Sequence, residues 1–247
     1  MKFASCVSVA AVSLAFAALP LTAQAQSFTE GFNSGGGTGW TTTNNSTNAD
    51  GSWGLASGLT NSGVTVVSPY EGNAFAVADY TSTGGDDSGV GTISNWLISP
   101  LITGMQNGDV ITFYTTTVPD SGFPDRLELR MSTGSGTDVG SSETSVGTFT
   151  SLLTSVNSTL DVGGYPETWT QYTVTLSGLS GPTTGRVAFR YFVTDGGPAG
   201  DNSNVIGVDA FSYTSVTAVP EPATWMMSLG GAALLLGLRR MRAKQQA

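Results

Sequence analysis

The sequence predicts an all-β fold, an antiparallel β-sandwich or jelly roll, flanked by an N-terminal signal helix and a C-terminal transmembrane helix. Segments rich in Val, Ile, Thr, Phe and Tyr recur between residues 26 and 217, and turns rich in Gly, Asn, Asp and Ser separate them. No long stretch of this region has helical periodicity. About eight such segments without intervening helices indicate two sheets that bury their apolar faces against each other.

The N-terminal segment, residues 1–25, is predicted to be a secretory signal peptide. Lys2 precedes an apolar run from about Val7 to Leu21, and a small-x-small sequence then ends at Ala25, after which we expect cleavage. Cys6 is the one cysteine of the chain and leaves with this segment, so the mature chain cannot form disulfides. About 190 residues remain before the C-terminal segment, which is enough for one domain with its own core.

Alternation of apolar and polar residues predicts the individual strands. In residues 125–133, Leu127, Leu129 and Met131 fall on one face, which we expect to be buried, and charged residues fall on the other, which we expect to face water. Residues 185–195 alternate similarly, apart from Phe192. Further strands are expected at 27–33, 73–80, 95–102, 109–118, 168–178 and 204–213. Residues 151–160 fit either a short helix or a loop.

Composition excludes several kinds of chemistry. The chain has no histidine, and its two lysines lie in the terminal segments, so Ser-His-Asp, Cys-His and Ser-Lys sites are excluded, as is zinc bound by nitrogen or sulfur. Residues 26–219 carry four arginines and seventeen acidic residues, a net charge of −13. Because this charge repels phosphate backbones, no nucleic-acid partner is expected. Divalent cations and neutral sugars remain plausible ligands.

Two carboxylates stand among the apolar residues of predicted strands. Glu30 lies in the first strand and Asp209 in the last, and a carboxylate in such surroundings needs a compensating partner. If the two strands approach each other, both residues could bind one calcium ion whose oxygen shell backbone carbonyls complete; Asp79 is a third candidate. The alternative is that each carboxylate faces water or pairs with an arginine. Residues 195–204 also carry oxygen ligands, but their composition favours a polar turn.

The tryptophans are candidates for stacking on sugar rings. Trp40 and Trp53 lie in stretches rich in Gly, Asn and Thr, where their rings could be accessible, whereas Trp96 adjoins Leu97 and Ile98 and resembles a core residue. Burial is nevertheless the favoured interpretation for any single ring, because aromatic side chains dominate protein cores.

The C-terminal segment, residues 218–247, is predicted to be a membrane anchor. Its run from Ala223 to Leu238 is almost entirely apolar and would form a helix about 24 Å long, close to the roughly 30 Å of a hydrocarbon core. Four basic residues follow in residues 239–247. Positive charges stay cytoplasmic, which places the folded domain outside. These charges are Arg239, Arg240, Arg242 and Lys244.

A short motif immediately precedes this apolar run. It consists of Val219, Pro220, Glu221 and Pro222. With the apolar helix, the basic end and the signal peptide, it resembles the PEP-CTERM sorting signal of Gram-negative bacteria. That resemblance implies recognition by an exosortase, a membrane enzyme that processes the tail, in organisms that make extracellular polysaccharide. The anchor would then be transient, and the protein would finish at the cell surface or in the extracellular matrix.

The predicted β domain, residues 26–217, has a resemblance of its own. Residues 27–40, 95–102 and 205–213 look like those of the choice-of-anchor J family, which is related to the cleaved-adhesin and MAM-like jelly rolls. In adhesin relatives, a first-strand glutamate and a last-strand aspartate help to hold calcium. The resemblance therefore implies this role for Glu30 and Asp209.

Two functions are compatible with these observations. The first is a non-catalytic, adhesin-like binding or structural domain associated with exopolysaccharide. The second is a glycoside hydrolase or lyase, which would need two carboxylates about 5 to 9.5 Å apart in a groove lined by aromatic residues. We favour the first, because a fold resemblance supplies no reaction. The carboxylates available for the second are Asp120, Asp125, Glu128, Glu143 and Glu167.

Overall fold

The computed structural model describes residues 27–33, 35–61, 63–84 and 89–216. The predicted signal peptide and the predicted C-terminal anchor, including the sorting motif and the basic residues, lie outside the described residues. The described residues contain no helix with the length and hydropathy of a membrane-spanning segment.

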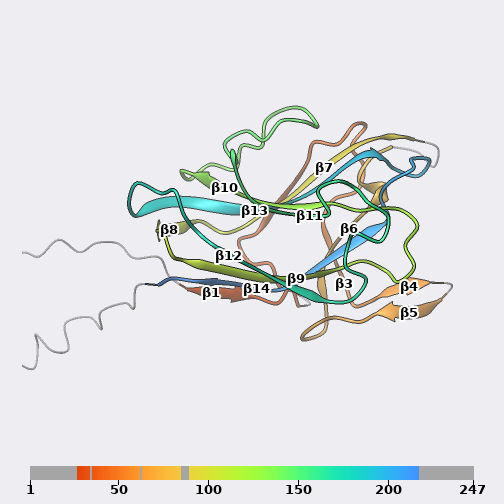
Figure 1. The fold of residues 1–247 in the computed structure, drawn as a ribbon, viewed down its shortest axis with the longest axis horizontal. Helices are drawn as coiled ribbons and strands as arrows, with labels where there is room; N and C mark the ends of the chain where they lie inside the picture. The colour runs from red at the N-terminus through yellow and green to blue at the C-terminus, as the bar shows by residue number, and fades with distance from the viewer. Residues whose placement is uncertain (1–26, 34, 62, 85–88, 217–247) are drawn as a thin grey trace, which may run out of the picture.

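Two antiparallel sheets of six strands stack face to face (Figure 1), so the predicted sandwich is confirmed. Sheet A has the order β12-β9-β14-β6-β3, with β1 beside β14. Its strands are β1 (Phe28–Glu30), β3 (Gly54–Ala56), β6 (Phe75–Asp79), β9 (Val110–Thr116), β12 (Thr170–Thr175) and β14 (Val205–Thr214). Because β14 pairs with β1, β6 and β9, the last strand of the described residues organises this sheet.

Sheet B has the order β11-β10-β13-β7-β2, with β8 also beside β13. Its strands are β2 (Thr41–Asn44), β7 (Gly91–Ile98), β8 (Ile102–Met105), β10 (Leu127–Thr133), β11 (Ser151–Val156) and β13 (Thr183–Gly196). A separate hairpin is formed by β4 (Leu59–Asn61) and β5 (Val64–Val67), and the 3-10 turn η1 (Tyr80–Ser82) follows β6. The hairpin packs on the outer side of sheet A, where Leu59 and Val67 contact Phe75.

The core lies between the sheets, on the faces that alternation predicts. Leu127 and Leu129 of β10 are fully buried beside Phe189 and Tyr191 of β13, to which they pair. Sheet A contributes residues such as Phe211 to the same cluster. The period of two in these strands therefore placed the inward face correctly.

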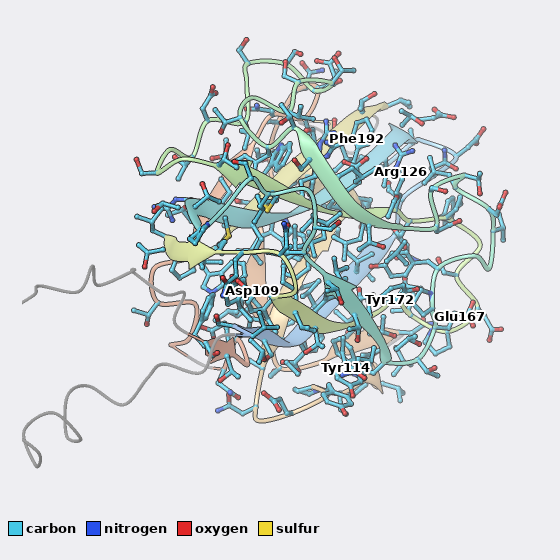
Figure 2. All side chains as sticks on the ribbon, turned by 60° about the vertical axis from the view of Figure 1, so that its left-hand side comes forward. Asp109, Tyr114, Arg126, Glu167, Tyr172 and Phe192 are labelled. Carbon is cyan, nitrogen blue, oxygen red and sulfur yellow. The ribbon has the colours of Figure 1, made fainter. Side chains whose placement is uncertain are left out.

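The outer face of sheet B corrects the prediction that the charged side of β10 faces water. Glu128 is buried and forms ion pairs with Arg130 (2.7 Å) and Arg190 (3.3 Å). The Arg190 guanidinium lies 3.7 Å from the centre of the Phe192 ring and 4.9 Å from that of Trp96. Arg126 covers Phe192 as well, at 4.3 Å, and the two residues lie near each other in Figure 2.

The segment between β10 and β11 covers this outer face of sheet B with apolar side chains. Val139 and Phe149 pack on Trp96, and the backbone oxygen of Glu143 accepts a hydrogen bond of 2.6 Å from Arg190. Glu128 and Arg190 are therefore shielded from water by a loop whose sequence has no strand-like pattern.

Residues 151–160 are resolved in favour of neither alternative: Ser151–Val156 form β11, an edge strand paired with β10. Their sequence lacks strict alternation because β11 is covered only in part, and Leu152 is half-exposed. Four short strands between residues 41 and 67, β2 to β5, were also not predicted. They are three or four residues long, too short for a periodic signal.

Candidate functional site

Asp209 is the best-connected of the three predicted calcium ligands. It is fully buried in β14 at a bulge, where the register with β9 shifts and Ala210 has a φ of 47°. Its Oδ2 accepts hydrogen bonds from the backbone N–H groups of Tyr70 (2.9 Å) and Glu71 (3.1 Å), and its Oδ1 accepts one from Ala210 (2.7 Å). Burial raises the pKa of the Asp209 carboxyl, although these hydrogen bonds oppose the shift. Asp209 thereby fixes the turn that carries Tyr70.

Tyr70 forms an aromatic platform with Tyr114 on the outer side of sheet A. The two rings stack with centroids 3.7 Å apart and an interplanar angle of 18°, and the Tyr70 side chain stays 44% exposed. A hydrogen bond with Tyr114 raises the pKa of Tyr70. Tyr114 lies on the opposite side of the molecule from Phe192 (Figure 2). An exposed aromatic face of this kind is a surface on which a flat apolar group can stack.

Trp169 extends the platform. Its ring lies edge-on to Tyr70 at 6.4 Å and to Phe75 at 5.2 Å, and its Nε1 donates a hydrogen bond of 2.8 Å to the Ser68 oxygen. Gly207 of β14 lies beneath it, and a Cβ at this position would come within 2.9 Å of the Trp169 ring. The absence of a side chain at Gly207 therefore lets the indole lie directly on the sheet.

Glu30 lies in β1 opposite Phe211, near the Asp209 turn. Its Oε1 accepts a hydrogen bond of 2.7 Å from the N–H of Phe32. Side-chain oxygens gather around nearby glycines: a Cβ on Gly31 would come within 2.8 Å of Glu71 Oε1, and one on Gly36 within 3.0 Å of Glu30 Oε1. The absence of side chains at these glycines lets the carboxylate oxygens lie close to the backbone.

These donors fit a hard cation in type, since carboxylates and carbonyls are what calcium prefers. Asp79 does not belong to the group, because it pairs with Val205, four residues from Asp209 along β14, and caps η1 by accepting the Thr81 N–H at 2.9 Å. Within the described residues, no three acidic side chains converge into a metal cage of their own. The structure thus brings Glu30 and Asp209 to one region and places Asp79 elsewhere.

The two tryptophans considered as candidates for stacking on ligands pack in or against the core, as the alternative of burial predicts. Trp53 is 7% exposed, and its Nε1 donates to the Asn95 oxygen at 3.0 Å. Trp40 is half-buried among aromatic rings, 5.2 Å from Phe32 and 5.1 Å from Phe211. Their polar neighbours in sequence gave no sign of this burial, because those neighbours form the short edge strands β2 and β3.

The platform residues were missed, although one signal was available. In residues 109–118, Ile111, Phe113 and Thr115 point into the core, so Tyr114 had to point outward. An outward tyrosine in a central strand is the residue that alternation identifies as unusual. Tyr70 offered no such signal, because it lies in a turn positioned by a residue 139 places further along the chain.

Two of the carboxylates considered for glycoside hydrolysis have other partners. Asp125 is fully buried and accepts hydrogen bonds from the Tyr191 hydroxyl (2.5 Å) and the Asn204 N–H (2.8 Å). Burial raises the pKa of Asp125 to about 7. Glu128 is held by Arg130 and Arg190 under the β10–β11 segment. Both carboxylates contribute to the packing of the domain.

Comparisons with known proteins concern the C-terminal motif and the β-sandwich separately. Residues 218–242 match the PEP-CTERM protein-sorting motif, as predicted. The search of curated proteins gave no match.

Among solved structures, the K1 cleaved adhesin domain of Lys-gingipain from Porphyromonas gingivalis W83 is 21% identical with a TM-score of 0.51, over 78% of this chain and 99% of that one. The K3 cleaved adhesin domain of the same protein is 20% identical with a TM-score of 0.48, over 76% and 99%. The CBM22-1 xylan-binding domain of Paenibacillus barcinonensis Xyn10C is 11% identical with a TM-score of 0.42, over 79% and 98%. The chain thus carries a PEP-CTERM sorting motif at its C-terminus, and its described part has the β-sandwich fold of a cleaved adhesin domain.

Proposed function

We propose that this chain is an exported surface or matrix protein whose β-sandwich binds neutral polysaccharide without catalysing a reaction. Its signal peptide would direct it through the inner membrane of a Gram-negative bacterium. Its C-terminal helix would hold it there until an exosortase-type enzyme processes the tail. The sorting motif at residues 218–242 supports this route, and the predicted basic end supports the orientation.

The observation that carries the binding function is the exposed platform of Tyr70 on Tyr114. Tyrosine combines a large apolar face with a hydroxyl group, so the exposed Tyr70 ring, stacked on the part-buried Tyr114 ring, can contact the apolar face of a sugar ring and its hydroxyl groups together. The backbone of Tyr70 is fixed by the buried Asp209, so little conformational freedom is lost on binding.

Charge favours a neutral ligand. Residues 26–219 carry a net charge of −13, which repels acidic polysaccharides. The arginines of the described region already bind protein groups: Arg126 the Phe192 oxygen, Arg130 Glu128, Arg186 the Ser99 oxygen, and Arg190 Ser94 and Glu128. These cations are engaged within the fold rather than presented to an anionic glycan.

The test is depletion of the full chain, in a detergent without a sugar headgroup, by insoluble cellulose, xylan and mannan. We expect at least one polymer to bind the native chain, and Tyr70→Ala to weaken that binding by about tenfold or more. Leu152→Ala is the matched control, because Leu152 is equally exposed but lies on the edge of sheet B. Equal binding by native and Tyr70→Ala chains would show that the Tyr70 platform does not bind the polymer.

A structural calcium ion held by Glu30 and Asp209 is a second part of the proposal. A ligand that binds only the folded state raises stability, by about 2.7 kcal/mol at a hundredfold excess over its Kd, and so raises Tm by several degrees. We expect added calcium to raise the Tm of the EDTA-treated chain, and expect Glu30→Ala and Asp209→Ala to abolish the increase. Asp79→Ala should keep it, since Asp79 lies elsewhere. An increase that survives both of the first two substitutions argues against this site.

A further inference from the structure

We call the end of the sandwich where the described chain begins and ends, near Ser27 and Ser215, the tethered end, and the opposite end the free end. Phe28 at the start of β1 pairs with Tyr213 near the end of β14, and the N–H of Ser215 donates to Ser27 Oγ at 2.9 Å. Both chain ends therefore leave the domain on the same side, at the left of Figure 1. Val205, the first residue of β14, lies at the other end, about 30 Å away for a ten-residue strand. Loops at that end are the part of the domain furthest from the tail.

A pocket of about 380 Å³ lies among the loops at this free end. Two exposed aromatic rings line it: Tyr80 of η1 is 41% exposed, and Phe123 of the β9–β10 loop is 49% exposed. The remaining lining residues come from the β13–β14 loop: Gly197, Pro198, Gly200, Ser203 and Asn204. The volume is at the small end of the range of about 300–1,000 Å³ for ligand pockets, which suits one ring-sized group.

The β13–β14 loop is held rigidly by hydrogen bonds within the protein. The Ser203 N–H donates to the Pro124 oxygen (3.0 Å), and Ser203 Oγ accepts the N–H of Gly197 (2.9 Å). Ser203 is buried and has a φ of 76°. This left-handed conformation costs free energy in a residue other than glycine, and the surrounding contacts must offset that cost. The pocket wall is therefore built before any ligand arrives, which lowers the entropic cost of binding.

Asp125 supports the pocket from below. Its Oδ1 accepts a hydrogen bond from the backbone N–H of Asn204 at 2.8 Å. The backbone oxygen of Asn204 in turn accepts one from the N–H of Tyr80 at 2.8 Å. One buried carboxylate thus connects the loop that forms the wall to the turn that carries an aromatic ring. Asp125 does not itself line the pocket, so it is a positioning residue.

The chemistry of the lining selects the ligand class. The three contributing segments, residues 79–84, 117–125 and 195–204, contain five aspartates and no basic residue, so an anionic group would be repelled. Aromatic rings contact apolar faces, and the hydroxyl groups of Tyr80 and Ser203 with the Asn204 amide oxygen can exchange hydrogen bonds with hydroxyl groups, while Asn204 Nδ2 donates to Ser121 Oγ at 3.1 Å. A neutral sugar ring presents both kinds of surface at the size of this pocket.

We propose that this pocket at the free end binds a single neutral pyranose ring, as a free sugar or as the end of a glycan chain. The inference rests on the proposed glycan-binding function, but it assigns a second site separate from the Tyr70 platform. Placing the site at the free end would let a membrane-held domain reach a glycan beyond the membrane surface.

Saturation-transfer NMR on the full chain, in a detergent without a sugar headgroup, tests this with D-glucose, D-galactose, D-mannose, D-xylose and D-glucuronate as probes. We expect transfer to at least one neutral sugar and none to glucuronate. Tyr80→Ala and Phe123→Ala should each weaken that binding by about tenfold, and Leu152→Ala, on the edge of sheet B, should leave it unchanged. Competition by the methyl glycoside of a matching disaccharide would identify a chain end as the source, whereas competition by the monosaccharide alone would identify a free sugar.

Both aromatic residues are exposed, so the substitutions should preserve the fold, and unchanged thermal midpoints would confirm this. The absence of transfer to every neutral sugar overturns the proposal, as does binding that survives both Tyr80→Ala and Phe123→Ala. Monosaccharide binding with no polymer depletion would instead contradict the platform and leave the pocket intact. Polymer depletion that only Tyr70→Ala weakens, without monosaccharide transfer, would contradict the pocket and leave the platform intact.

Discussion

The two ends of the sandwich are each secured by a buried aspartate that accepts a hydrogen bond from a tyrosine hydroxyl. At the tethered end, Asp109 binds the Tyr213 hydroxyl and also accepts the backbone N–H groups of Gln106 (2.9 Å) and Val216 (3.0 Å). Val216 is the last described residue before the C-terminal segment. Asp109 therefore fixes the point at which the chain leaves the domain.

At the free end, Asp125 has a different set of partners. It binds the hydroxyl groups of Tyr191 (2.5 Å) and Thr117 (3.1 Å) but only one backbone N–H, that of Asn204. Burial disfavours the charged carboxylate, and this one N–H with two hydroxyl groups compensates only in part, so the pKa of Asp125 rises to about 7. Two similar buried carboxylates thus have different roles. Asp109 fixes the point where the chain leaves the domain, and Asp125 holds a loop through a carboxyl group whose pKa is raised to about 7.

The largest expected effect is the pH dependence of stability at the free end. Between the ordinary pKa of 3.8 and about 7, folded Asp125 retains a proton that the unfolded chain has lost, so the free energy of unfolding decreases as pH rises through this window. The decrease from this group is about 4 kcal/mol. Urea unfolding of the native chain and of Asp125→Asn at pH 4 to 8 measures it. The substitution should flatten the profile, and parallel profiles would show that Asp125 does not titrate there.

At the tethered end, Asp109→Ala should lower the free energy of unfolding by about 3 kcal/mol, because it leaves the buried Tyr213 hydroxyl and two backbone N–H groups without their acceptor. Urea unfolding at constant pH measures the loss. Asp138→Ala is a suitable control, since Asp138 binds the Gly140 N–H in an exposed loop. A loss no larger than that of the control would mean that the chain exit is not secured by Asp109.

The smallest expected effect is the coupling between the two ends. Asp109 and Asp125 lie near opposite ends of β14 and share no partner, so the effects of Asp109→Asn and Asp125→Asn should add within about 0.5 kcal/mol. A double-mutant cycle in urea tests this. A larger coupling energy would show that the ends communicate, and the comparison would have to be replaced by one cooperative unit.

Much of the fold could be predicted because its signals are local. Strand β10 repeats its apolar residues with a period of two, and this placed Leu127 and Leu129 in the core correctly. Strands β2 to β5 were not predicted, because a strand of three or four residues is too short to show a period of two. The burial of Glu128 was also not predicted, because the segment that covers it belongs to a separate, irregular part of the chain.

For the candidate site, the sequence identified single residues but not their partners. Asp209 was singled out by its apolar neighbours, and its burial confirms that it needed compensation. The groups that compensate it are the N–H groups of Tyr70 and Glu71, which carry no side-chain signature. Trp40 and Trp53 were considered as ligand-stacking residues because their neighbours are polar, which is a weak guide where those neighbours form short edge strands over a core.

The all-β class, the inward faces of the long strands and the sorting motif at residues 218–242 could be predicted, because each is encoded in consecutive residues. Which carboxylates are buried, which aromatic rings stay exposed and where a pocket forms depend on the tertiary structure. Those properties depend on contacts between segments far apart in the chain, such as the 139 residues between Tyr70 and Asp209. Such contacts are made by backbone groups that every residue possesses, so the identity of the residues does not reveal them.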